Sequence, residues 1–175
     1  MNYLHKYTVP NFLKHKNNII NLIKKIPTNS YKDKTQSISH TDWNITNLKN
    51  KKYLDYVVNN IFPDFGLYCC QKFKVNKLEI KNVWFQLYKK NDFHNIHLHG
   101  GCHFSNVFYI NLPNKLKTKV YDLDDSVINF NVSEGDIVSF PGFLKHESLV
   151  NLSNKDKIII SATNIFAAEV SEQPK

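Results

Sequence analysis

Apolar residues in the first part of the chain recur at steps of three and four, which is the spacing of one face of a helix. The first such face consists of Phe12, Ile19, Ile20, Ile23 and Ile26. Pro27 follows and ends this pattern. The second face consists of Leu54, Val57, Val58 and Ile61. Pro63 interrupts it before a third apolar run at residues 67–73. We therefore expect residues 1–76 to be mostly helical, with a polar and irregular segment at 28–44.

After residue 76 the pattern changes to short runs rich in β-branched and aromatic residues, separated by polar turns. The runs cover residues 78–88, 104–112, 118–123, 127–132, 136–140 and 157–166. Strands at this density, with no helices between them, predict an antiparallel sandwich or barrel. We expect a single α+β, mainly β domain over residues 1–175, in which helical support at 1–76 packs outside a β core at 77–170.

Composition and charge narrow the range of functions. No apolar run approaches the roughly 18 residues of a membrane span, and the 5 glycines fit no P-loop or dinucleotide-binding fingerprint. The formal charge is +8, but all 23 basic residues are lysines spread along the chain, which favours nucleic-acid binding only weakly. The 3 cysteines, two of them adjacent, indicate a reducing compartment. A cytoplasmic protein without membrane contact is the expectation.

Histidines are concentrated in one short segment. His94, His97, His99 and His103 lie within ten residues, and His146 follows later. Alternate side chains of a strand point to the same face, so His97 and His99 can both face the interior of a barrel. Neutral imidazole is a favoured ligand of Fe, Zn, Cu and Ni, and a third histidine from a distant strand would complete one face of a metal site. Solvated loop histidines are the alternative interpretation.

The surrounding segments resemble a known family. VWFQLYKKNDF at 83–93, HLH at 97–99, FSNVFYINLP at 104–113 and EGDIVSFPGFLKH at 134–146 follow one another in the order found in iron(II)/2-oxoglutarate oxygenases of bacteria and their phages, which are relatives of the prolyl hydroxylases. The similarity spans about residues 78–166. It implies a double-stranded β-helix (jelly-roll) barrel, Fe(II) and 2-oxoglutarate as cofactors, O2 as cosubstrate and hydroxylation of a substrate. A phage protein of this kind would lie in the host cytoplasm.

The resemblance also implies the metal ligands, which are His97, His99 and His146. The family's usual triad is His, Asp or Glu, His, so His99 stands where a carboxylate is expected. An all-imidazole site is neutral where the usual site is anionic. Asp92 and Glu147 are the nearby carboxylates that could replace His99 as a ligand or orient the ligating rings from behind.

A cation is implied for the distal carboxylate of 2-oxoglutarate. In the family this is usually an arginine on the last barrel strand, and this chain has none. Lys157 shares a strand face with Ser161, so an ammonium and a hydroxyl would point at one carboxylate, and Lys155 is the rival on the same alternation. The resemblance adds the phenol of Tyr88. Phe108 occupies the position of a second tyrosine, so that contact is lost.

Other interpretations stay open. A cupin-type metalloprotein would use His97, His99, His103 and His146 without 2-oxoglutarate, and a non-catalytic module would use the basic surface alone. Kinship favours prolyl hydroxylation, but a peptide, a small molecule and a nucleic acid all remain candidate substrates. A homodimer formed through the outer helices also remains open, although the N-terminal region contains no heptad repeat.

Overall fold

A computed structural model describes residues 4–27, 29–45 and 48–167. Its helices are α1 (Leu13–Lys24), α2 (Lys52–Asn60) and α3 (Phe62–Phe73), with short 3-10 turns at Leu48–Asn50 and Pro113–Lys115. Its strands are β1 (His5–Thr8), β2 (Asn29–Lys32), β3 (Gln36–Thr41), β4 (Lys77–Tyr88), β5 (Phe93–His97), β6 (Phe104–Asn111), β7 (Thr118–Val120), β8 (Asp136–Pro141), β9 (His146–Ser148) and β10 (Lys157–Ala167). Within these residues, no helix combines the length and apolar character needed to cross a bilayer.

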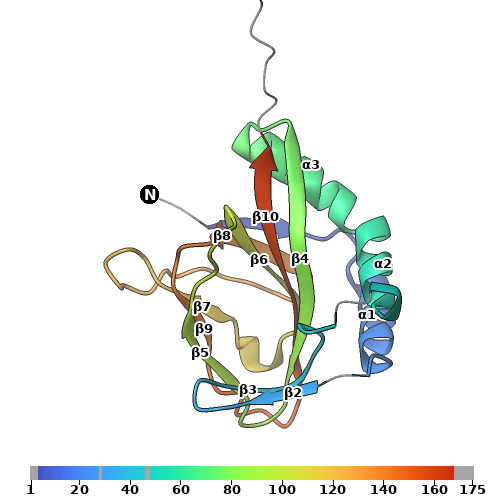
Figure 1. Cartoon of the computed structure of the whole chain (residues 1–175), viewed down its shortest axis with the longest axis vertical. Coiled ribbons are helices and arrows are strands. Elements are labelled where there is room, and N and C mark those ends of the chain that lie inside the picture. The colour runs from blue at the N-terminus through green and yellow to red at the C-terminus, as the bar shows by residue number, and fades with distance from the viewer. Residues whose placement is uncertain (1–3, 28, 46–47, 168–175) are drawn as a thin grey trace, which may run out of the picture.

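The strands form one antiparallel, 10-stranded sheet in the order β1-β8-β6-β10-β4-β3-β5-β9-β7, with β2 attached to β3. The sheet curls into a jelly-roll half-barrel, and the three helices lie outside it against the side formed by β4 and β10 (Figure 1). The expected fold class, a mainly β jelly roll with the N-terminal helices packed outside, is confirmed. The barrel interior is therefore free to hold a site.

Alternation along the long strands separates two apolar clusters. On β10, Ile158 and Ile160 face outward and pack with the helices, whereas Ile159 faces the barrel interior. On β4, Phe85 and Leu87 belong to the outer cluster. Successive strand residues point to opposite faces, so the polar residues between these positions must point inward. The same pattern that packs the helices thus places Gln86 and Lys157 inside the barrel.

One buried ion pair joins the helical side to the sheet. The Asp42 carboxylate, fully buried just after β3, lies 3.1 Å from Lys51 Nζ. It also accepts hydrogen bonds from the Tyr53 hydroxyl at 2.8 Å and from the Phe85 amide at 2.8 Å. These partners come from the start of α2 and from β4, so one side chain fixes the position of α2 on the barrel.

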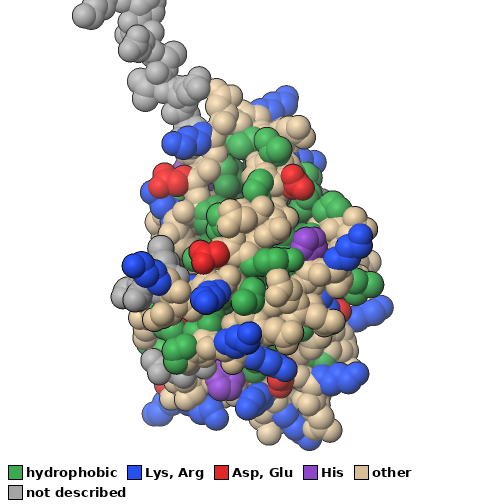
Figure 2. Space-filling model, turned by 90° about the vertical axis from the view of Figure 1, so that its right-hand side faces the viewer, with side chains coloured by type: hydrophobic (Ala, Val, Ile, Leu, Met, Phe, Trp, Pro, Cys, Tyr) green, Lys and Arg blue, Asp and Glu red, His purple; other side chains and the backbone are tan. Residues whose placement is uncertain are grey.

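The first 76 residues contain more strand than the sequence pattern predicts. α1, α2 and α3 confirm the helical stretches, but β1, β2 and β3 lie in segments expected to be helical or irregular. The predicted strand at 127–132 was wrong, because this segment makes only an isolated bridge between Tyr121 and Val127. The helical face carries lysines scattered among polar and apolar side chains rather than gathered in one patch (Figure 2).

Candidate active site

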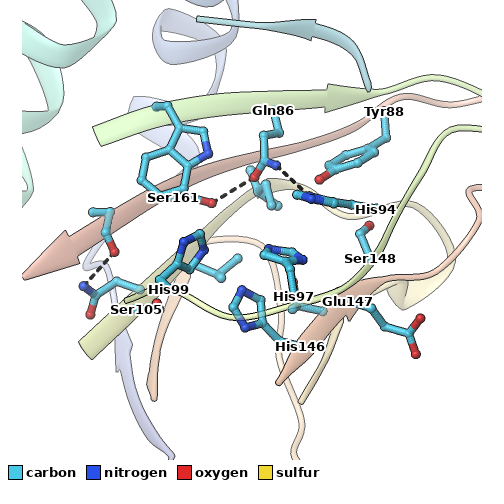
Figure 3. A pocket seen from close by; sticks show the side chains of 16 residues that line it. Gln86, Tyr88, His94, His97, His99, Ser105, His146, Glu147, Ser148 and Ser161 are labelled. Carbon is cyan, nitrogen blue, oxygen red and sulfur yellow. Dashed lines mark hydrogen bonds between the residues drawn. The ribbon is translucent and has the colours of Figure 1, made fainter. Parts of the chain in front are cut away.

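Three of the predicted site residues meet at one point inside the half-barrel. β5 pairs with β9 so that His97 lies opposite His146. His99 lies just beyond β5, where its backbone N–H donates to the Gly142 carbonyl at 3.0 Å. One ligand nitrogen from each of His97, His99 and His146 lies within 4.8 Å of the other two, and the rings point toward a common centre (Figure 3). Segments about 50 residues apart thus form a group able to hold a metal ion.

Backbone carbonyls orient two of these rings. His97 Nδ1 lies 2.8 Å from the Asn95 carbonyl, and His146 Nδ1 lies 3.0 Å from the Leu144 carbonyl. A carbonyl can only accept, so each Nδ1 carries the proton and each Nε2 keeps its lone pair. This is the arrangement in which metal-ligating histidines are usually held. The His99 ring instead packs edge-on against Trp84, with centroids 5.5 Å apart.

A fourth histidine lies behind the triad. His94 stacks on His97 with ring centroids 3.8 Å apart and is connected to β10 through Gln86. The Ser161 hydroxyl donates to Gln86 Oε1 at 3.0 Å, so the Gln86 amide group faces His94 Nδ1 at 3.4 Å. The sequence placed His94 in the histidine cluster but assigned it no role in the site. The pairing register of β5 is irregular between His94 and His97, so residues three apart face the same cavity. Strand alternation alone does not predict this.

Lys157 is fully buried, and no carboxylate pairs with it within the described part of the chain. Its ammonium donates to the Ser148 hydroxyl at 2.8 Å and lies 5.3 Å from the centre of the Tyr88 ring. Ser148 and Tyr88 both line the cavity that contains the triad, so the ammonium adjoins that cavity. The sequence did not point to Ser148, although its position two residues after His146 places both on one strand face.

The other predicted residues lie apart from this centre. Lys155 is exposed, and Phe108 packs under the helices. His103 is exposed, and its Nδ1 accepts from the Phe166 amide at 2.9 Å. The four-histidine set of a cupin is therefore not assembled.

The two nearby carboxylates serve the framework. Asp92 accepts hydrogen bonds from the Ser37 hydroxyl at 2.6 Å and from the backbone of Ser39 and Lys89. The Glu147 carboxylate points away from the histidines, toward Lys119 at 3.3 Å and the Tyr121 hydroxyl (Figure 3). Neither touches the rings that could bind a metal.

Burial keeps the clustered imidazoles neutral. Desolvation, together with a smaller effect of the neighbouring imidazoles, lowers the pKa of His94 and of His146 to about 3 and that of His99 to about 4. Desolvation also lowers the pKa of His97. Neutral imidazole is the form that binds a metal ion, so the cluster is ready to act as a ligand set at neutral pH.

We expect the metal-free protein to lose stability steeply in mild acid. An unfolded histidine has a pKa near 6.5, so below this pH the unfolded chain binds more protons than the folded one. The stabilisation is complete above pH 6.5 and is lost as the pH falls toward 3. Thermal unfolding followed from pH 8 to pH 4 measures this loss of stability. The decrease in melting temperature per pH unit should be smaller in His94→Gln than in the wild type. A melting temperature constant between pH 7 and pH 5 would contradict these pKa shifts.

No family model matches this chain, and no curated protein matches it in sequence. Solved structures do match. An oxidoreductase of the 2OG-Fe(II) oxygenase family from Burkholderia pseudomallei superposes with a TM-score of 0.73 at 13% identity, covering 94% of this chain and 88% of that one. A non-heme alpha ketoglutarate dependent epimerase, SnoN from nogalamycin biosynthesis, gives 0.70 at 9% identity, covering 93% and 78%.

A Pseudomonas putida prolyl-4-hydroxylase gives a TM-score of 0.65 at 14% identity, covering 95% of this chain and 94% of that one. These similarities extend over the helices as well as the barrel, since nearly the whole chain is covered. The fold implied by the sequence resemblance is therefore confirmed. The chain has the jelly-roll fold of the 2-oxoglutarate–Fe(II) oxygenases.

Proposed function

We propose that this protein is a non-haem Fe(II)/2-oxoglutarate-dependent dioxygenase that hydroxylates an organic substrate. The observation that carries the proposal is the meeting of His97, His99 and His146 in one cavity whose wall adjoins the buried, unpaired ammonium of Lys157. Iron and 2-oxoglutarate together supply the activation of O2 for oxidation of a C–H bond.

The donor set fits this metal. Three imidazole nitrogens suit Fe(II) and leave the opposite positions open for a chelating acid and O2. Two of the rings are already held with Nε2 free, so the ion would enter a preorganised site. Imidazoles alone would also suit Zn, Cu or Ni, and the dicarboxylate site is therefore what favours an oxygenase.

The chain offers a matching site for 2-oxoglutarate. A buried cation without a counter-ion is costly, and a carboxylate placed beside Lys157 and Ser148 would supply the missing charge and accept their hydrogen bonds. Tyr88 lines the same cavity, and its pKa is raised by burial, so its phenol stays a neutral donor. Ser161 would act from the middle of the cavity, directly or through Gln86.

Anaerobic titration with Fe(II) and 2-oxoglutarate tests the proposal. A weak visible charge-transfer band should appear only when both are present. His146→Gln should weaken metal binding at least about 100-fold because a ligand is removed. His103→Gln, which removes an exposed histidine outside the cluster, should titrate like the wild type. Metal binding without any effect of 2-oxoglutarate would favour a cupin-type protein, and loss of the band in His103→Gln would contradict the ligand assignment.

A further inference from the structure

A second cavity opens next to the triad. It has a volume of about 470 Å³ and shares two lining residues, Trp84 and His99, with the cavity that holds the histidines. Its wall continues through Gly100 and Gly101 and reaches Trp43. A ligand here would contact His99, a proposed metal ligand, so the cavity is close enough to the reaction centre to hold the substrate.

Both tryptophans of the chain line this cavity. Trp43 is 47% exposed and Trp84 only 6%, and their ring centroids lie 5.4 Å apart. The indoles lie tilted by 33° against each other and lead from the surface to His99, which lies against Trp84. The buried Nε1–H of Trp84 has no hydrogen-bond acceptor among the described residues. The exposed indole surface of Trp43 suits a flat ring.

Among the described residues, the charged side chains that line the cavity are two lysines, Lys51 and Lys81. Lys51 donates to the carboxylate and the carbonyl of Asp42, which leaves one of its three N–H groups unused among the described residues. Lys81 pairs with Glu79, but both side chains are largely exposed, so this pair is weak and Lys81 can turn to a ligand. The lining favours an anion.

His99 removes the negative charge that would otherwise oppose such an anion. A carboxylate at this position, as in the usual triad, would place a negative charge in the wall of the cavity. The imidazole leaves the wall neutral, and with the dianionic cosubstrate the Fe(II) complex would be neutral as well. The departure from the usual ligand pattern and the two lysines therefore act in the same direction.

We infer that this cavity binds the primary substrate and that the substrate carries a planar unsaturated ring with an anionic group, such as a nucleotide phosphate or the carboxylate of an aromatic acid. The ring stacks on Trp43 and the anionic group lies against Lys81. This assignment rests on the proposed function for the reaction, but ligand binding itself requires neither iron nor O2.

Calorimetric titration of the full chain tests it, both metal-free and loaded with Mn(II) and 2-oxoglutarate. The probes are adenosine 5′-monophosphate, adenosine, 4-hydroxybenzoate and a neutral proline-containing peptide. We expect at least one of the two anions to bind, and the monophosphate to bind about tenfold more tightly than adenosine if the source is a nucleotide. Trp43→Ala should weaken binding about tenfold, the effect of losing one aromatic stack, and Trp43→Phe should restore most of it.

Charge variants distinguish anion binding in the cavity from a general effect of the protein's positive charge. Lys81→Gln should weaken anion binding several-fold and lower its salt dependence, whereas Lys77→Gln, on the same strand but outside the cavity, should not. His99→Asp should weaken anion binding to the metal-free protein. Equal effects of the two lysine variants, or binding of the peptide but of neither anion, would overturn the inference. Binding to the metal-free protein is independent of the Fe(II) titration, so each proposal can fail while the other stands.

Discussion

Replacing Lys157 by methionine is expected to stabilise the metal-free protein and to weaken 2-oxoglutarate binding strongly. Burial lowers the pKa of this ammonium to about 7, against 10.5 in an unfolded chain, so folding at neutral pH works against its charge. Methionine has a similar length and needs no counter-charge. Allowing for the Ser148 hydroxyl that loses its partner, we expect a gain of about 2–3 kcal/mol in the free energy of unfolding.

The pH dependence of this effect has a defined sign. Between pH 7 and pH 10.5 the unfolded wild-type chain holds a proton on residue 157 that the folded chain has released, so wild-type stability rises with pH across this window. The difference between Lys157→Met and the wild type should therefore shrink as the pH approaches 10.5. Denaturant unfolding at pH 7, 8.5 and 10 measures this trend.

Whereas Lys157→Met should raise the stability of the metal-free protein, it should lower the affinity for 2-oxoglutarate. Loss of the cation that we propose for the distal carboxylate should weaken 2-oxoglutarate binding at least about 50-fold, since charge-assisted hydrogen bonds are the strong ones. Lys155→Met, an exposed lysine two residues earlier, is the matched control and should change neither property. If Lys157→Met destabilised the metal-free fold and left 2-oxoglutarate affinity intact, Lys157 would be a framework residue and the cosubstrate site would lie elsewhere.

Asp42→Ala is expected to cost about 3–5 kcal/mol, the largest loss of stability from a single substitution considered for this protein. The change leaves the buried Lys51 ammonium without its counter-ion and removes the acceptor used by Tyr53 and by the Phe85 amide. Chemical denaturation with a far-ultraviolet signal measures it. Glu79→Ala, which breaks an exposed ion pair with Lys81, should change stability by no more than about 0.5 kcal/mol.

The double substitution Asp42→Asn with Lys51→Met separates charge from hydrogen bonding. Asparagine keeps an acceptor for the Phe85 amide, and methionine removes the stranded ammonium, so much of the lost stability should return. A loss in Asp42→Ala no larger than in Glu79→Ala would show that α2 is held on the barrel by its apolar face alone.

The sequence predicted those parts of the fold whose pattern is set by their own residues. α1 and the long strands β4, β6 and β10 bury a continuous apolar face, so periodicity identifies them. The strands β1, β2 and β3 are short and polar. They are strands because β1 pairs with β8, β3 pairs with β4 and β5, and β2 pairs with β3. Their signal lies in these partners and is absent from their own composition.

The prediction of a strand at 127–132 was wrong for the opposite reason. Its alternation is that of a strand, and Val132 is indeed buried in the interior cluster with Ile128 and Phe130 packed against it. No neighbouring strand pairs with it beyond the bridge at Val127, so its apolar residues fill the core from an irregular backbone. Burial alone does not make a strand, and pairing cannot be deduced from periodicity.

The functional site, like the fold, was predictable only in part. The H-x-H spacing and the family resemblance identified the residues that the structure brings together in the triad, and strand alternation placed Lys157 inside. The sequence did not predict side-chain contacts between different strands. Ser148 meets Lys157 and His94 meets Gln86 only because separate strands come together, and Trp43 reaches Trp84 from a loop.

The pairing of His97 with His146 across adjacent strands bears on which positions tolerate change. The distance between these two rings is set by the spacing of a β-ladder, and a slip of one strand by one residue would turn its ring outward. His99 lies past the end of its strand and outside any strand ladder, on a connection that exchanges two backbone hydrogen bonds with Gly142. A different donor atom can be accommodated there by a small loop adjustment. Variation in ligand chemistry should therefore concentrate at residue 99, while the other two positions stay fixed.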